Sequence, residues 1–358
     1  MTRQNAAVDT KELNVFRLER SLNWVGGIRV AIVVGAIVSW CFYTDNLHYA
    51  LPLATGSLFT GMAEGGEKTG HRWRTMLWAT AWLCFGALIG GLLTNQVWLG
   101  LIATAAFAAC TGLAGAASAR SGVIGLLGLV VFTIYLGGPD TAVSPWLAAG
   151  LIALGGVLQA LVMIVPYLIF TPKKVIAAYS KQPPFFPRIR QALHWHNQYV
   201  DHAIRLSVAV TIATAIAQAS GIQHQYWLPM TVAWVTQSGQ LGTVRRVLSR
   251  ILGTAGGLLI VVLFIDGLHA QGQWLVPLTT IAAGVAMTFI TSNYLIGVLG
   301  TTTLIVTLLY MDGDKLGSTV PERLGETIVA GIIAIIALSI WPDKKLTNDQ
   351  HAILSETN

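Results

Sequence analysis

The sequence predicts an all-α integral membrane protein of about twelve transmembrane helices, arranged as two parallel repeats of six. Of its 358 residues, 54% are hydrophobic and only 11% are charged, whereas a soluble domain has about 25% charged residues. The apolar residues form long runs, many of them close to the roughly 20 residues that a helix needs to cross a bilayer. Related patterns also recur about 176 residues apart, which indicates a repeat.

The first half of the chain begins with a polar segment, residues 1–23, where helical spacing behind Asp9 and Glu12 predicts a cytoplasmic interfacial helix. The first six-helix repeat, 24–170, contains apolar spans at about 24–43, 49–62, 75–93, 97–113, 122–137 and 145–168. Residues 171–200 are polar and rich in proline, so we expect a cytoplasmic linker that carries an amphipathic segment.

The second half repeats this organisation. The second six-helix repeat, 201–342, contains spans at about 202–219, 226–238, 251–265, 274–290, 294–311 and 325–341. Residues 343–358 then form a polar tail, which we expect in the cytoplasm.

Lysine and arginine residues determine the expected orientation. Eighteen of the 22 fall on the side of the N-terminus, the linker and the tail. Lys315 and Arg323 fall on the opposite side, and Arg29 and Arg205 lie inside spans. Because cytoplasmic loops carry the excess of positive charge, both termini are expected in the cytoplasm. The net charge of +6 is thus a topology signal, and no nucleic-acid partner is expected.

The repeat rests on matching segments that occur in the same order in both halves. The matching pairs are 28–31 with 204–207, 51–53 with 228–230, and 124–128 with 296–300. Each half holds an even number of spans, so both halves enter the membrane from the cytoplasm and the repeat is parallel. Such repeats are typical of transporters whose substrate path lies between the halves.

The second half also carries the motifs of a known family. They are HAIRL at 202–206, YWLP at 226–229, RILGT at 250–254, GTTTL at 300–304, Glu322-Arg323 and Trp341-Pro342. In this order and spacing the chain resembles the fusaric acid resistance (FUSC) family, clearly over about 200–345 and as a weaker copy over 24–168. The large cytoplasmic domains of longer members have no counterpart in this sequence.

The resemblance implies a function and partners. Many FUSC members export aromatic carboxylic acids across the inner membrane of Gram-negative bacteria, often with a periplasmic adaptor. We therefore expect an inner-membrane exporter of small organic anions, with the lipid bilayer, the anion, a periplasmic adaptor and a homo-oligomer as candidate partners. The plant malate channel family is distantly similar, so an anion channel is one alternative, and a non-transporting membrane scaffold is another.

Two short, interrupted spans are the expected substrate site. Pro52 interrupts the span 49–62, and Pro229 interrupts the span 226–238, so both prolines are predicted to be helix breaks. A proline frees a backbone carbonyl, which hydrocarbon cannot satisfy, so such segments favour a polar cavity. The polar or aromatic residues that these spans supply are Thr55, Ser57, Thr60, Thr231, Trp234, Thr236 and Gln237. The alternative is a pair of kinked helices that pack through small residues.

Arg29 and Arg205 are the two cations well inside the expected spans, at matching positions of the two halves. Each could present its guanidinium to a substrate carboxylate, or could extend to the cytoplasmic headgroups as an anchor. Arg250, at the start of its expected span, is interpreted as such an anchor.

No catalytic residue, metal site or cofactor is expected. Residues 267–272 have the glycine spacing of a phosphate-binding loop, but Gln273 occupies the position of the required lysine. The histidines at 194, 196 and 202 lie on a basic interfacial stretch without a suitably spaced carboxylate or cysteine, which disfavours a metal cluster.

Overall fold

The computed structural model describes residues 22–64, 72–138, 143–170, 185–193, 197–236 and 240–340, together with Val15 and Leu18. Within these ranges the secondary structure is helical, with turns and short connections. Ten helices are long and apolar enough to cross a membrane. The prediction of an all-α, multi-pass membrane protein is therefore confirmed. The expected interfacial helix of residues 1–23 lies almost entirely outside the described residues.

The first half contains six apolar helices in the order expected. They are α1 (Trp24–Tyr43), α2 (Ala50–Ala63), α3 (Arg72–Leu93), α4 (Val97–Ala117), α5 (Ala119–Leu136) and α6 (Pro145–Phe170), with a 3-10 turn η1 (Leu47–Tyr49) before α2. The linker region contains α8 (Phe185–Ala192), which packs against α4 and whose Arg188 donates a hydrogen bond to the carbonyl of Ala117.

The second half has the same order. Its helices are α9 (Gln198–Ser220), α10 (Trp227–Val235), α11 (Gln240–Val262), α12 (Leu275–Phe289), α13 (Tyr294–Met311) and α14 (Leu316–Ile340). A π-helical turn η2 (Leu263–Gly267) extends α11, and a 3-10 turn η3 (Gly272–Trp274) precedes α12. Two of the apolar helices, α2 and α10, are too short to span a bilayer alone, with 14 and nine residues.

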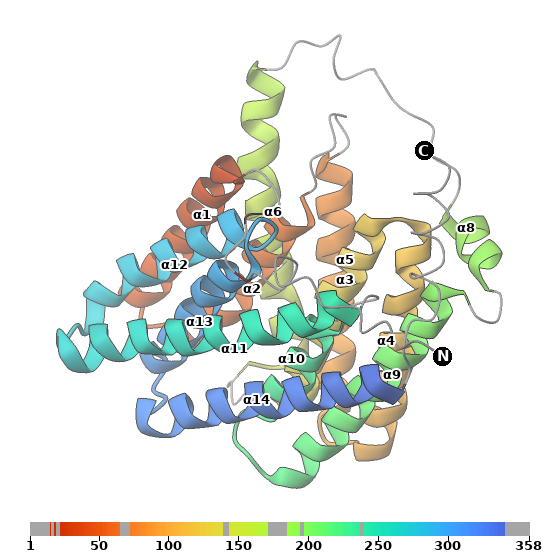
Figure 1. The fold of residues 1–358 in the computed structure, drawn as a ribbon. Coiled ribbons are helices and arrows are strands. Elements are labelled where there is room, and N and C mark those ends of the chain that lie inside the picture. The colour runs from red at the N-terminus through yellow and green to blue at the C-terminus, as the bar shows by residue number, and fades with distance from the viewer. Residues whose placement is uncertain are drawn as a thin grey trace, which may run out of the picture.

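The helix contacts of one half have counterparts in the other. In the first half α3 packs on α5 and α6, α4 packs on α5, and α2 packs on α6. In the second half α11 packs on α13 and α14, α12 packs on α13, and α10 packs on α14. Between the halves α1 packs on α12, and α4 packs on α9. In Figure 1 the short helices α2 and α10 lie in the middle of the bundle, surrounded by longer helices.

Close packing between helices depends on small residues. A methyl group added at Gly90 of α3 would lie 2.4 Å from the carbonyl oxygen of Phe132 in α5, and one at Gly253 of α11 would lie 2.5 Å from that of Leu295 in α13. Small residues that let two helix backbones approach are typical of membrane helix interfaces, because no water is available there to drive apolar side chains together.

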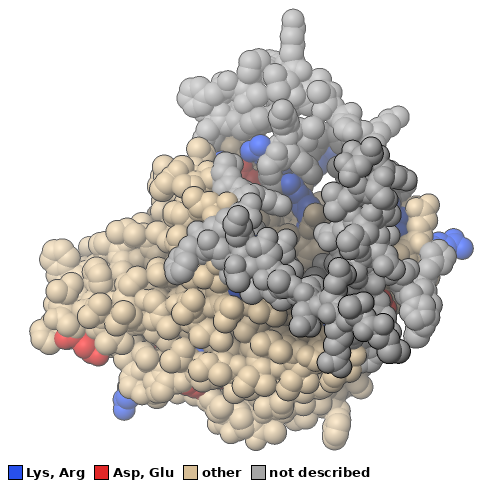
Figure 2. All heavy atoms as spheres, in the orientation of Figure 1, with Lys and Arg blue, Asp and Glu red and all other residues tan. Residues whose placement is uncertain are grey.

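Large apolar side chains cover the outside of the bundle. Trp98 is 79% exposed and Trp78 is 74% exposed, as a surface in contact with lipid allows. Figure 2 shows the described part of one face, where uncharged residues predominate and the few charged side chains lie mainly near its margins. The surface is therefore that of a membrane-embedded protein.

Candidate functional site

The two short helices begin in the same way. Pro52 and Pro229 are each the third residue of their helix, in the first turn. A backbone N–H in the first turn has no partner within the helix, so a proline there costs no hydrogen bond. The structure thus corrects the assignment of both prolines as helix breaks: they help to start α2 and α10.

Both short helices also end in extended backbone. Glu64 follows α2 with a ψ of 109°, and Thr236 follows α10 with a ψ of 111°. The chain therefore leaves each helix well before it could cross a bilayer. The middle of the bundle is built from short elements of both halves, which leaves room for a cavity there.

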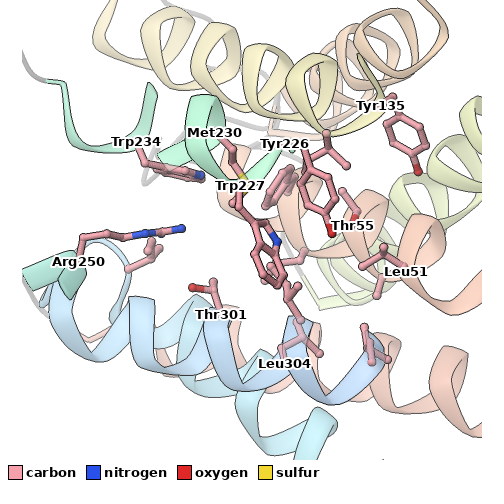
Figure 3. A pocket seen from close by; sticks show the side chains of 17 residues that line it. Leu51, Thr55, Tyr135, Tyr226, Trp227, Met230, Trp234, Arg250, Thr301 and Leu304 are labelled. Carbon is pink, nitrogen blue, oxygen red and sulfur yellow. The ribbon is translucent and has the colours of Figure 1, made fainter. Parts of the chain in front are cut away.

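A cavity lies between α2 and α10. Its walls also include α5, α11 and α13, so both halves of the chain contribute. The lining residues are mostly aliphatic, with five aromatic side chains: Phe59, Tyr135, Tyr226, Trp227 and Trp234. Thr55 and Thr301 supply hydroxyl groups, and Figure 3 shows them with the labelled aromatic residues around the cavity. An apolar pocket with a few polar groups is the usual form of a small-molecule site.

Arg250 of α11 supplies a cation to this cavity. Its side chain extends between Trp234 and Thr301 (Figure 3), and the residue is only 5% exposed. The structure gives its Nε no hydrogen-bond partner among the described residues, and the same holds for the indole Nε1 of Trp227. A buried donor without a hydrogen-bond partner is unfavourable, so these two N–H groups are available to an acceptor that enters the cavity.

A second layer of charge lies behind Trp227. Arg323 of α14 is 2% exposed, and its guanidinium carbon lies 4.9 Å from the centre of the Trp227 ring. Arg250 and Glu326 both interact electrostatically with Arg323. Arg250, Arg323 and Glu326 therefore form a cluster of interacting charges next to the cavity.

His224, just before α10, is held between two acidic residues. Its Nδ1 lies 2.9 Å from Oε2 of Glu322, and its Nε2 lies 2.9 Å from Oδ2 of Asp314. The backbone N–H of His224 donates to Oε1 of Glu322 at 3.0 Å. The imidazole stacks on Trp227, with ring centres 4.2 Å apart and planes 9° from parallel. Each ring nitrogen of His224 therefore faces a carboxylate, and the cluster ties the segment before α10 to α14 and to the loop that precedes α14.

We expect His224→Ala to destabilise the folded protein by about 2–3 kcal/mol, because it removes the imidazole that bridges Asp314 and Glu322 and leaves both carboxylates without this partner. The measurement is thermal unfolding of the purified protein in detergent. The matched control is His269→Ala, at an exposed histidine on the loop after η2, and it should change the melting temperature little. Equal losses in the two variants would contradict a structural role for this cluster.

The structure places the predicted hydroxyl residues of the first short span in two different environments. Thr55 lines the cavity, as does Trp234. Ser57 instead donates a hydrogen bond to Oε1 of Gln159 in α6 at 3.0 Å, and the hydroxyl of Thr60 lies 2.8 Å from that of Thr80 in α3. These two hydroxyls hold α2 against its neighbours.

In the second short span, Thr231 is fully buried and is absent from the residues described as lining the cavity. Thr236 donates a hydrogen bond to the carbonyl of Val232 at 2.8 Å. Gln237 lies outside the described residues. Trp234 is therefore the predicted residue of this span that the structure brings to the cavity.

Neither of the two arginines predicted to bind substrate is among the described residues that line the cavity. Nη1 of Arg29 lies 3.0 Å from Oε1 and 3.1 Å from Oε2 of Glu64, so its charge is paired with that carboxylate. Arg205 lies on α9 and is only 2% exposed, so it is buried in the interior of the bundle.

The cavity residues that the sequence did not identify include Arg250, Tyr226 and Trp227. Arg250 was interpreted as an anchor because its span was expected to start at 251. However, α11 begins at Gln240, so Arg250 lies ten residues, or about 15 Å, inside the helix. The sequence signal that could have identified them was the motif pair 226–229 and 250–254, which contains all three residues.

Comparison with protein families gives a match in the second half of the chain. Residues 212–337 match the family model described as fusaric acid resistance protein-like. This region runs from α9 to α14 and contains Arg250, Arg323 and Glu326.

Three curated relatives cover similar lengths of the chain. Uncharacterized protein ORF2 of Neisseria gonorrhoeae is 30% identical over 174 residues, which is 47% of this chain and 40% of that protein. Uncharacterized protein YhfK of Escherichia coli is 27% identical over 176 residues, 48% of this chain and 24% of that protein. Inner membrane protein YccS of Escherichia coli is 30% identical over 151 residues, 41% of this chain and 20% of that protein.

The matched part is less than half the length of each of these relatives. No solved structure gives a significant match. The matches confirm the resemblance identified from sequence motifs: residues 212–337 are similar to the fusaric acid resistance-like membrane proteins.

Proposed function

We propose that this fusaric acid resistance-like membrane protein exports small organic anions from the cytoplasm, with aromatic carboxylic acids as the leading substrate class. One observation carries the proposal: the cavity between α2 and α10 combines the buried cation Arg250 with aromatic walls. The proposal assigns transport to the cavity and requires no catalytic residue, metal or cofactor.

The chemistry of the cavity fits an aromatic carboxylate. The guanidinium of Arg250 can donate two parallel hydrogen bonds to a carboxylate, and the indole N–H of Trp227 can add a third. Trp234 and Tyr226 offer ring faces and edges to an aromatic ring. An aliphatic anion of the same charge would lack these ring contacts, so aromatic acids should bind more tightly.

The arrangement of the helices supports a path between two six-helix halves. The ten long helices and the two short ones give six per half, and the contacts within one half recur in the other. Transporters built from repeats bind their substrates at the interface of the repeats. The inner membrane is the proposed location, because one relative is named an inner membrane protein. A periplasmic adaptor and a homo-oligomer remain proposed partners.

The test is flux through vesicles that contain the purified full-length protein. Vesicles loaded with radiolabelled benzoate should release it faster than protein-free vesicles. An interior-negative potential should accelerate release, because an outgoing monoanion gains roughly 2.3 kcal/mol per 100 mV. Flux that saturates with benzoate concentration indicates a carrier, whereas single-channel conductance in a planar bilayer indicates the channel alternative. No flux and no conductance would leave the scaffold alternative and refute the proposal.

Topology gives a separate prediction. Reporter fusions at Lys174 and in the tail after residue 343 should both report the cytoplasm, because most of the 22 basic residues fall in segments that are expected on that side. Fusions near Asp266, in η2 at the end of α11, should report the periplasm. A periplasmic signal at Lys174 would rule out two parallel halves.

A further inference from the structure

Glu326 is a buried carboxyl group near the cavity that the proposed transport step does not use. It lies on α14, which packs against α10 and α11, the two helices that carry Trp227 and Arg250. The residue is 6% exposed, and neither of its carboxylate oxygens has a hydrogen-bond partner among the described residues. An ionised carboxylate in this position would be poorly solvated.

The charged groups that act directly on Glu326 lie on its own helix, and one of them connects it to other helices. Arg323 and Glu322 lie on α14 itself, and Glu322 is held by His224. Arg323 interacts in turn with Arg250 of α11, with the phenol of Tyr226 at the start of α10, and with the phenol of Tyr294 on α13. The protonation state of Glu326 therefore changes the net charge of this cluster, which includes Arg250, the cation that lines the cavity.

From this arrangement, and resting on the proposed function, we infer that a proton binds to Glu326 together with the substrate anion. With Glu326 ionised, its negative charge offsets one of the two arginine charges and opposes the anion. With Glu326 protonated, both arginine charges act on the anion. A proton and a monoanion that enter together leave the net charge of the site unchanged, which favours joint entry into a low-dielectric environment.

The step is a simple protonation. A proton from water forms an O–H bond with one carboxylate oxygen of Glu326, and no other covalent bond changes. By linkage, a proton that strengthens anion binding is itself bound more strongly when the anion is present. Benzoate affinity should therefore rise on acidification, and benzoate binding should take up protons.

The experiment measures benzoate binding to the purified full-length protein by titration calorimetry between about pH 6 and 8.5, well above the pKa of about 4 of a free carboxylic acid. The wild-type dissociation constant should increase with pH by up to about tenfold per unit, with uptake of up to about one proton per benzoate. Proton uptake is obtained from repeats in buffers of different ionisation enthalpy.

The decisive variant is Glu326→Gln, which resembles the protonated side chain in shape. It should bind benzoate as tightly as the wild type does at low pH, without pH dependence and without proton uptake. The control is Asp312→Asn, in the loop between α13 and α14, because burial raises the pKa of the Asp312 carboxyl and makes it a second candidate source of a pH effect. This control should keep the wild-type slope.

The outcomes separate this inference from the proposed function. Benzoate binding that is independent of pH in the wild type, or a slope that persists in Glu326→Gln, would overturn the role of Glu326 and leave anion transport standing. A slope that is lost in Asp312→Asn would also overturn it. A complete lack of benzoate binding at every pH would overturn both.

Discussion

Arg250→Ala is expected to abolish benzoate binding and export while leaving most of the folded protein intact. The substitution removes the cation that lines the cavity, and a charge-assisted hydrogen-bonded pair with a buried carboxylate is worth about 3–5 kcal/mol when one partner is removed. That corresponds to a loss of affinity of more than about 100-fold. Binding is measured by calorimetry, and export by benzoate release from vesicles.

Two further variants make this result specific. Arg250→Lys keeps the charge but loses the planar fork, so it should bind benzoate with intermediate affinity. Arg74 opens the corresponding helix of the first half, but it is exposed and lies outside the cavity lining, with its guanidinium 5.2 Å from the Trp73 ring. Arg74→Ala should transport normally. If Arg250→Ala also does so, the cavity is not the anion site.

Gly155→Ala is expected to cause the largest loss of folded protein among single-methyl changes in the first half. A methyl group at Gly155 of α6 would lie 2.1 Å from the carbonyl oxygen of Leu53 in α2, and Gly56 of α2 makes a similar approach to Ile152. Because these contacts are to backbone atoms, α2 would have to move away from α6 and toward the cavity. We expect a destabilisation of about 3 kcal/mol, together with impaired transport by the protein that remains.

Gly150, five residues earlier on α6, provides the matched control. A methyl group there would have no atom within 4 Å, and the residue is exposed. Gly150→Ala should therefore be neutral, or stabilising by up to about 1 kcal/mol, because alanine is the better helix former. The measurements are the yield of monodisperse protein and its melting temperature in detergent. Similar behaviour of the two variants would show that α2 can shift at little cost.

The sequence was most informative about elements defined by local composition. The long apolar runs predicted the membrane helices, and the spans at 49–62 and 226–238 correspond to the short helices α2 and α10. The prediction that Pro52 and Pro229 break helices is wrong, because the same proline breaks a helix or starts it according to where the helix begins. Helix boundaries are set by tertiary packing and are weakly encoded locally.

Charge pairs between distant parts of the chain could not be predicted from the sequence. His224 meets Asp314 and Glu322, which lie 90 and 98 residues further along the chain. Arg29 is neutralised by Glu64, 35 residues away, although the sequence placed it as a free cation within a span. No rule of sequence spacing predicts such pairs, so the structure is needed to show which charges are paired within the helix bundle.

The packing of α1 on α12 has a consequence for biosynthesis. A ribosome adds about 5–20 residues per second, so tens of seconds separate the emergence of α1 from that of α12, the helix against which Gly27 and Gly35 of α1 are packed. During that interval the small-residue face of α1 has no native partner in the bilayer. The face of α4 that packs on α9 likewise has no partner until α9 is inserted. Nascent chains of this protein should therefore depend on a membrane chaperone or insertase that shields these faces until the second half has been inserted.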